Sequence, residues 1–432
     1  MKLQTCGIVL AFCVASTNLF AQAAFSHRKN DSLPPPNATK SATNFSHVIG
    51  WKEGEMPVAP EGFKVTKYAD GFDNCRWLYV TPNGDVLVAE SNSNHPLIEK
   101  IGGTIIGASK SNNLSKSADR ITLLRDHDKD GLPEVHDIFL EKEKLAQPFG
   151  MAVIDDWFYV ANTDAIWRFH YQPGQTRILN EGQKIADLPA GKHNRHWTRN
   201  ILASKDGKKI YVAVGSGSNI AEFGIDNELL RANIIEMDID GTNERVYAAG
   251  LRNPVGMAWA PGTKSLWTVV NERDELGDDL VPDYLTRVKD GGFYGWPYSY
   301  YGDHEDPRVK EPRPEVVNET IVPDVQLGAH TASLGLVFYT ADAFPKRYRN
   351  GAFIAQHGSW NRSTLSGYKV VFVPFSGGEP AGEPEDFLTG FIADLEKGKV
   401  HGRPVGLAVM PDGSLLVADD VNGVIWRVTA ER

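Results

Sequence analysis

The sequence has 432 residues, of which 41% are hydrophobic and 23% are charged, and its formal net charge is −10. A chain of this length and composition contains enough apolar material for one large core. The negative charge argues against binding nucleic acid or an anionic membrane through the overall electrostatic field. The composition therefore fits one large globular domain that binds neither nucleic acid nor a membrane surface.

The first 23 residues have the features of a cleavable signal peptide. After a short basic start, residues 6–20 are mostly apolar, and the Ala-Gln-Ala of residues 21–23 has the pattern of a signal peptidase site. The apolar stretch is shorter than the about 20 residues that a membrane span needs. We therefore expect an exported protein, periplasmic or secreted, with no membrane span. Cleavage would remove Cys6 and Cys13 and leave Cys75 alone, so that no internal disulfide could form.

Residues 24–57 contain three consecutive prolines, Pro34 to Pro36, and many Ser, Asn and Thr residues. This composition predicts a flexible N-terminal lead-in. One domain is then expected from residue 58 to residue 432.

Six segments of that domain share one pattern, in which two short apolar runs flank a turn rich in Gly, Asn, Asp or Pro. In chain order the turns are centred on Asn83, Asp155, Asp206, Gly262, Asp342 and Asp412. Such turns let the chain reverse without strain, so each segment predicts a β-hairpin. Candidate third strands follow four of the hairpins, at residues 165–169, 234–238, 368–373 and 424–428.

Recurring hairpins without amphipathic helices between them cannot bury their own faces, so they need a closed array of neighbours. The pattern predicts an all-β fold, a six-bladed β-propeller with long loops. A pair of β-sandwiches is the alternative, and the regular repeat favours the propeller. The strand near residues 63–68 should pair with the C-terminal strands, because unpaired end blades would leave exposed edges. Loops at one end of such a fold converge on the central channel.

Residues 126–134, Asp-His-Asp-Lys-Asp-Gly-Leu-Pro-Glu, resemble the start of a calcium loop, with acids at alternate positions before a glycine. Position twelve is Asp137 instead of a glutamate, and the flanking segments read as strands. Two interpretations remain open: a hairpin turn that holds a structural calcium ion, and the same turn without an ion.

Polar residues on three loops are candidates for chemistry. His196 precedes the third hairpin and is the candidate general base, because the unperturbed pKa of a histidine is near neutrality. Arg252 and Asn253 precede the fourth hairpin. The guanidinium of Arg252 offers a planar fork of hydrogen-bond donors, and the side-chain amide of Asn253 both donates and accepts. For Arg252 the alternative is an ordinary ion pair with an aspartate. His401 and Arg403 precede the last hairpin and would bring a second cation to the channel.

An acidic segment and an aromatic segment follow the fourth hairpin. Residues 272–279 hold five acids in eight positions, which suits a hard cation such as calcium, although a solvated loop is the alternative. Residues 291–301, Gly-Gly-Phe-Tyr-Gly-Trp-Pro-Tyr-Ser-Tyr-Tyr, would pack between blades or line a sugar-sized cleft. His330 and His357 come from the next blade, where a hydrogen-bonding and a functional role are equally open.

Three of these motifs together resemble the sorbosone and soluble glucose dehydrogenase family: Gly-x-Arg-Asn-Pro at 250–254, the acidic segment at 271–279 and Gly-Gly-Phe-Tyr-Gly-Trp-Pro at 291–297. The resemblance extends from about residue 60 to the C-terminus. It implies a six-bladed propeller that binds pyrroloquinoline quinone (PQQ) and calcium in its channel. The implied activity is oxidation of a sugar or a related aldehyde or polyol, with an external electron acceptor as a partner.

The resemblance also implies roles for individual residues. Arg252, as a catalytic residue, and Asn253 would contact the quinone, and Arg403 would bind one of its carboxylates. His357 stands in place of a cofactor-contacting lysine. His196 falls at the position of the family's general base, which takes the proton of the substrate hydroxyl while hydride moves to the quinone.

Arg273 and Asp274 match the positions whose backbone carbonyls hold calcium in the glucose enzymes, where the ion acts as a Lewis acid. The pair replaces a Gly-Pro, in agreement with the sorbosone branch. Val255 and Ser216 stand where the glucose enzymes have a glutamine and an aspartate that orients the base.

Two other functions remain open from the sequence. One is a calcium-dependent propeller hydrolase or lactonase, in which channel acids hold the ion and a histidine activates water. The other is a propeller that only binds glycans. The paired arginines favour the dehydrogenase, because PQQ carries carboxylates that an arginine fork binds and a lactone carries none.

Overall fold

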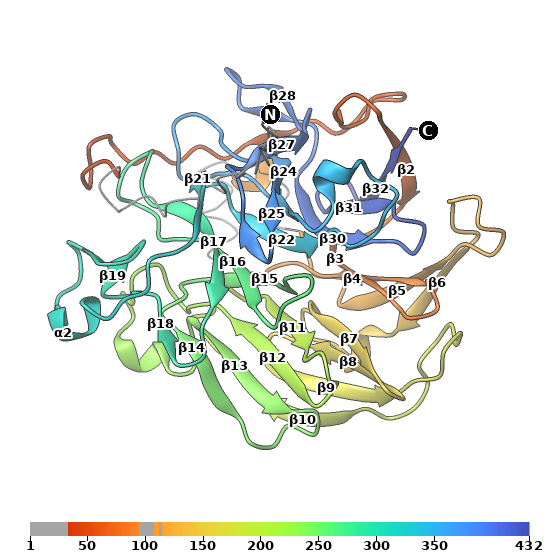
Figure 1. Cartoon of the computed structure of the whole chain (residues 1–432), viewed down its shortest axis with the longest axis horizontal. Coiled ribbons are helices and arrows are strands. Elements are labelled where there is room, and N and C mark those ends of the chain that lie inside the picture. The colour runs from red at the N-terminus through yellow and green to blue at the C-terminus, as the bar shows by residue number, and fades with distance from the viewer. Residues whose placement is uncertain (1–32, 95–107, 112–114, 432) are drawn as a thin grey trace, which may run out of the picture.

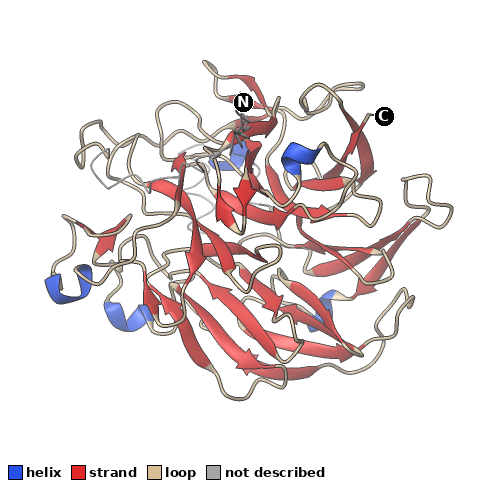
Figure 2. Ribbon diagram, viewed as in Figure 1, coloured by secondary structure: helices blue, strands red, loops and turns tan. Residues whose placement is uncertain are grey.

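The structure is a computed structural model that describes residues 33–94, 108–111 and 115–431, so the predicted signal peptide lies outside it. Almost every element of the described chain is a β-strand (Figure 2). The helical elements there are α2 (Pro314–Val317) and the short 3-10 turns η2 (Ala108–Ser111), η3 (Lys142–Lys144), η4 (Ile225–Glu228) and η5 (Lys346–Tyr348). The predicted all-β class is confirmed. None of the helices in the described ranges is long and apolar enough to cross a membrane.

Most strands of the described chain belong to six sheets of four or five strands each (Figure 1). The first two comprise β3 (Cys75–Val80), β4 (Val86–Glu90), β5 (Arg120–Arg125) and β6 (Val135–Leu140), then β7 (Met151–Ile154), β8 (Trp157–Ala161), β9 (Ala165–His170) and β10 (Gln183–Asp187). The next two comprise β11 (Arg199–Ala203), β12 (Lys209–Val214), β13 (Asn233–Asp238), β14 (Arg245–Ala249) and β18 (Gly292–Phe293), then β15 (Pro254–Trp259), β16 (Leu266–Val270), β17 (Pro282–Val288) and β21 (Val325–Ala329). The last two comprise β22 (Ser333–Phe338), β23 (Ala352–Gln356), β24 (Lys369–Val373) and β27 (Glu385–Leu388), then β30 (Pro404–Val409), β31 (Leu415–Asp419), β32 (Val424–Ala430) and β2 (Phe63–Asp70).

The first two strands of each sheet are one of the six predicted hairpins, so all six hairpins are confirmed. The four predicted third strands are β9, β13, β24 and β32. Asp155, in the two-residue turn between β7 and β8, has φ of 51°, a conformation that Asp tolerates in hairpin turns. The predicted closing contact is also confirmed, because β2 pairs antiparallel with β32 and joins the sheet of the C-terminal strands.

The sheets pack face to face, and their first strands meet. β3 lies against β7, β7 against β11, β11 against β15, β15 against β22, and β22 against β30, which also lies against β3. Glycines in these strands permit the approach. A Cβ at Gly256 would lie 2.6 Å from the Leu334 carbonyl oxygen, and one at Gly335 would lie 2.2 Å from that of Val405.

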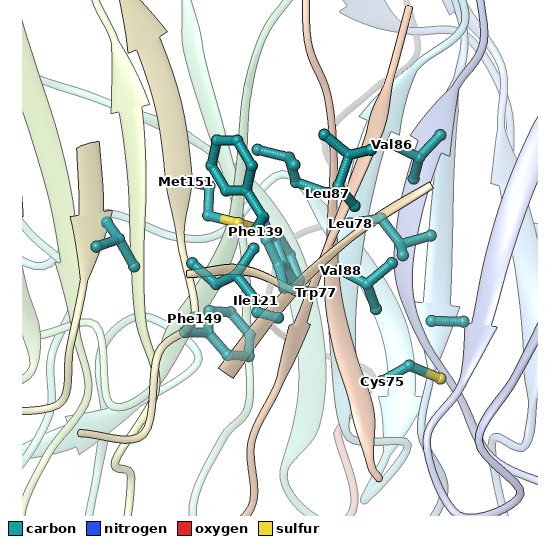
Figure 3. Packing of buried hydrophobic residues seen from close by; sticks show 14 of the residues in the cluster. Cys75, Trp77, Leu78, Val86, Leu87, Val88, Ile121, Phe139, Phe149 and Met151 are labelled. Carbon is teal, nitrogen blue, oxygen red and sulfur yellow. The ribbon is translucent and has the colours of Figure 1, made fainter. Parts of the chain in front are cut away.

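The core fills the spaces between the sheets. Strands β4, β16, β23 and β31 are buried along their whole length, because both of their faces are covered by neighbouring sheets. Around the first sheet, residues of β3 and β4 pack against residues of the second sheet, and Trp77 lies 4.5 Å from Phe149 between ring centroids (Figure 3).

Part of the segment predicted to be a flexible lead-in is packed on the sheets. β1 (His47–Val48) pairs in parallel with β29 (Lys399–Val400), which also pairs with β28 (Ile392–Asp394). The Asn37 amide donates to the Leu276 carbonyl (2.7 Å) and the Asn44 amide to that of Trp360 (2.8 Å). This segment, red to orange, crosses the upper part of Figure 1.

Two further small ladders join β19 (Ser299–Tyr300) to β20 (His304–Glu305) and β25 (Phe375–Ser376) to β26 (Glu379–Pro380).

Candidate functional site

Polar residues gather where the loops before the first strands meet those after the second strands. In an antiparallel hairpin these two positions lie at the same end, so the six hairpins bring their loops together. Buried ionisable residues there include Arg252, Glu272, Arg273, His330, His357, Arg403 and Asp420. A buried charge is costly unless it is paired, so each of these residues should have a partner nearby. We define the candidate site by these residues and their partners.

Arg252 lies at the centre of one cluster. Its Nε and Nη2 donate to the backbone carbonyl and side-chain oxygen of Asn219 (3.2 and 2.9 Å), and its Nη1 donates to the carbonyls of Asn271 and Glu272 (3.2 and 2.6 Å). Its Nη2 also pairs with the Asp274 carboxylate at 3.2 Å. The fork is held rigidly, and the ion pair with an aspartate foreseen as an alternative is present.

His196 lies beside this cluster and is half-buried. Its Nδ1 is 2.9 Å from both the carbonyl oxygen and the hydroxyl of Ser216, whose amide donates to the Arg252 carbonyl. Because a carbonyl only accepts, Nδ1 carries the hydrogen and Nε2 is left with a lone pair. Burial, together with the positive charge of Arg252, holds the pKa of His196 well below its usual range. The imidazole is therefore neutral at neutral pH.

Asn253 adjoins His196 through Gly215. A Cβ at Gly215 would lie 2.4 Å from Asn253 Oδ1 and 2.5 Å from the His196 Cβ, so only glycine permits this approach. Asn253 Oδ1 is buried and has no hydrogen-bond partner within the part of the chain that the structure describes. An unsatisfied amide beside a histidine and an arginine fits a polar ligand that completes its hydrogen bonding.

A second cluster surrounds His357. Its Nε2 is 3.0 Å from both oxygens of Asp420, which also pairs with the guanidinium of Arg76. Arg403 donates from Nε to the His357 carbonyl (3.0 Å). Burial and the nearby Arg403 lower the pKa of His357 to about 3. Burial opposes the charge of Asp420, but His357 and Arg76 outweigh it and hold the pKa of that carboxyl below its usual range.

The two clusters adjoin each other, because the Arg76 guanidinium lies 5.7 Å from the ring centroid of Trp197, the neighbour of His196. Sequence reasoning did not single out Arg76, Asn219 or Asp420. Arg76 stands at the start of the first hairpin, as Arg252 and Arg403 stand before the fourth and sixth. That shared position was the available signal.

The candidate calcium residues lie next to Arg252. Burial opposes the charge of Asp274, but His330 at 3.2 Å and Arg252 lower the pKa of its carboxyl. Burial likewise opposes protonation of His330, yet Asp274 raises the pKa of that histidine. The Asp274 carbonyl accepts from Asn219 Nδ2 (3.2 Å), and the buried Arg273 guanidinium faces Asp306 at 2.9 Å. In Arg273 only the backbone carbonyl could serve a cation.

The structure places His401 with the lead-in. Its Nδ1 donates to the Gly50 carbonyl (2.8 Å), and its ring stacks on Trp51 with centroids 4.7 Å apart. Glu55 lies 3.6 Å from the same Nδ1. These contacts hold the ring of His401 against the lead-in. Contact between His401 and a cofactor stays a prediction.

The acidic loop at residues 126–134 connects β5 and β6. Its four carboxylates, from Asp126, Asp128, Asp130 and Glu134, place one oxygen each within 4.8 Å of one another. They also accept hydrogen bonds from amides of the loop itself, such as that of Gly131 to Asp126 (2.8 Å). Asp137, at position twelve counted from Asp126, lies on β6, in agreement with the expected strand.

Comparison with known proteins identifies the family of this chain. The TrAA12-like family model matches residues 57–283 and 313–431. An uncharacterized protein of Borreliella burgdorferi is 30% identical over 308 residues, 68% of this chain and 79% of that protein. A pyrroloquinoline quinone-dependent pyranose dehydrogenase of Coprinopsis cinerea is 23% identical over 434 residues. That match covers 87% of this chain but only 54% of the dehydrogenase.

Solved structures share the fold. The holo form of the PQQ domain of the Coprinopsis cinerea pyranose dehydrogenase superposes with a TM-score of 0.69 at 20% identity, covering 89% of this chain and 100% of the other. A calcium structure of a Trichoderma reesei carbohydrate-active enzyme of family AA12 gives 0.70 at 19% identity, covering 90% and 99%. At such identities the likeness concerns the fold alone.

Proposed function

This chain belongs to the TrAA12-like family, and from that premise we propose that it is a PQQ-dependent oxidoreductase that oxidises a sugar with the help of calcium. One observation carries the proposal most: Arg252, Arg403 and Arg76 converge with the neutral His196 at one end of the sheets. Guanidinium groups suit a ligand with carboxylates, and a neutral imidazole suits a substrate that must lose a proton.

We propose in addition that the six sheets are the blades of one closed six-bladed propeller. The contacts between successive first strands, including the contact of β30 with β3, support closure. The pairing of β2 with β32 supports it too, because it joins the beginning of the domain to its end. The candidate site then lies at one mouth of the channel.

The residues present fit PQQ. Arg252 and Asn253 would hold it on one side, and Arg403 and His357 with Arg76 on the other. The unsatisfied Asn253 Oδ1 supports this fit, as do the guanidinium groups of Arg76, Arg252 and Arg403. When bound, PQQ would accept the two electrons of the sugar, and calcium would polarise it as a Lewis acid.

His196 acts as the general base in this proposal. Its Nδ1 hydrogen bond to the Ser216 carbonyl fixes the tautomer and the direction of the ring. Nε2 then faces the substrate with a lone pair and takes the proton of the hydroxyl that is oxidised. Ser216 orients the base through its carbonyl and hydroxyl, which is the task of an aspartate in the glucose enzymes.

The backbone carbonyls of Arg273 and Asp274 are the proposed calcium ligands. A carbonyl oxygen has two lone pairs, so the bond from Asn219 leaves the oxygen of Asp274 able to bind a cation. The proposal also includes export through the signal peptide at residues 1–23 and an external electron acceptor.

Reconstitution tests the proposal. Purified protein is titrated with PQQ in the presence of calcium chloride, and the absorbance of bound quinone is followed. We expect saturable binding that EDTA weakens, and reduction of an electron-accepting dye on addition of a sugar. If the folded protein binds no PQQ in the presence of calcium, the proposal is overturned. The hydrolase and the glycan-binding protein would then be the functions to test.

A further inference from the structure

A polar cavity lies where the N-terminal lead-in crosses the loops that follow β16 and β23. It has a volume of about 500 Å³, is open to solvent, and is lined by five residues of the segment 37–43 together with Glu275 and Asn361. All seven side chains carry a hydrogen-bonding group, and none is apolar. Such a lining suits a ligand rich in hydroxyl groups better than a hydrophobic one.

Glu275 connects the cavity to the candidate site along the chain. Glu275 directly follows Asp274, whose carboxylate pairs with Arg252 at 3.2 Å. The Glu275 amide donates to Asn361 Oδ1 at 2.9 Å, so the loops after β16 and β23 meet at the base of the cavity. The cavity and the candidate site are therefore joined by consecutive residues of one loop.

Three side chains of the cavity hold its walls together. Thr39 and Ser41 accept hydrogen bonds from the amides of residues 278 and 277 at 2.8 and 3.0 Å. Asn361 Nδ2 donates to the lead-in backbone at 3.1 Å. Gly277 allows this docking, since a Cβ there would lie 2.8 Å from the Thr39 carbonyl oxygen. The lead-in is therefore held in a defined position by polar contacts.

The side chains of Asn37, Lys40 and Thr43 are exposed and make no hydrogen bond or ion pair within the described ranges. The Glu275 carboxylate is already paired with Arg308. The residues that line the cavity thus fall into two groups. Some hold the lead-in in place, and the others are available to a ligand. Trp360, next to Asn361, stacks on Phe45 and remains 39% exposed, which adds an apolar ring beside the polar lining.

We propose that this cavity is an outer sugar subsite, which binds the non-reacting units of an oligosaccharide whose terminal unit enters the candidate site. The inference rests on the proposed sugar oxidation and adds the class of substrate: an oligosaccharide in preference to a free monosaccharide. Asn37 and Lys40 donate to sugar hydroxyls, and Thr43 both donates and accepts.

Binding to the PQQ-free full chain tests this subsite. Calorimetric titrations with glucose, cellotriose and maltotriose compare the parent protein with the double variant Asn37→Ala/Lys40→Ala. Lys64→Ala, which removes an exposed lysine of β2, is the matched control. We expect at least one trisaccharide to bind the parent about tenfold or more tightly than glucose, and the double variant to lose most of that advantage. The control should keep it.

The two proposals fail separately. A parent protein that binds no trisaccharide more tightly than glucose, or a double variant that keeps the full advantage, overturns the subsite. A protein that shows the trisaccharide advantage but never binds PQQ keeps the sugar subsite and loses the proposed oxidation.

Discussion

Replacing Arg252 by lysine tests how far this side chain supports both the fold and the cofactor site. The guanidinium donates five hydrogen bonds, all to groups of the protein. A lysine keeps the charge, but its single ammonium has three donors and no planar fork, so at least two of the five bonds are lost. At about 0.5–1.5 kcal/mol for each bond, the free energy of unfolding should fall by about 1–3 kcal/mol.

The same variant should bind PQQ at least about tenfold more weakly, or roughly 1.4 kcal/mol, because a lysine cannot hold the Asn219 and Asp274 groups in place beside the proposed cofactor site. Urea unfolding of the PQQ-free protein measures the first effect, and absorbance titration with PQQ and calcium measures the second. Arg313→Lys is the control, since that exposed guanidinium lies 3.8 Å from Glu315 and away from the site. Parent-like stability and parent-like PQQ affinity in Arg252→Lys would refute the reasoning.

Three further predictions concern other residues of the candidate site. His196→Gln should lower kcat by roughly 100-fold or more while PQQ affinity is retained, the pattern of a lost general base, and an unchanged kcat would place the base elsewhere. Gly215→Ala should lower the free energy of unfolding by about 1–3 kcal/mol, since the new methyl meets His196 and Asn253, and thermal unfolding that matches the parent would contradict this packing. His357 has a folded pKa of about 3, against an ordinary value of 6.5, so the unfolded state binds more protons between these values and stability should fall as pH drops from about 6.5 towards 3. Urea unfolding as a function of pH measures this slope, and His357→Asn should flatten it.

The strands could be predicted because turn chemistry is local. A second repeat in the sequence points the same way: Phe149-Gly-Met-Ala152, Val255-Gly-Met-Ala258 and Val405-Gly-Leu-Ala408. In each, a Cβ on the glycine would lie 2.3–3.1 Å from the backbone of the next first strand. The glycine therefore marks where a first strand meets its neighbour, and this repeat predicts sheet packing as well as sheet formation.

The packing of the lead-in could not be predicted from its composition. Its prolines and small polar residues indicate a segment that buries little apolar surface. The structure holds the segment through hydrogen bonds, such as those from Asn37 to Leu276 and from His47 to Gly398, and through the packing of Trp51 against Phe391 and Trp426. Those partners are more than 200 residues away in the sequence, so no local pattern contains them. The stacking of His401 on Trp51 escaped prediction for the same reason.

Arg252 and Arg403 of the candidate site could be proposed from the sequence because they stand at recognisable places before hairpins, whereas Asn219 and Asp420 follow second strands without a motif. The resemblance to the glucose enzymes implies that Ser216 stands in place of an aspartate that orients the base. A carboxylate would fix the ring of His196 and raise its pKa, whereas the Ser216 carbonyl fixes the ring and adds no charge. The negative charge that favours protonated His196 comes instead from Asp274, which is shared with Arg252 and His330. The same loop would then balance the charge of the proposed base and carry the proposed calcium ligands, so changes at Asp274 should affect both.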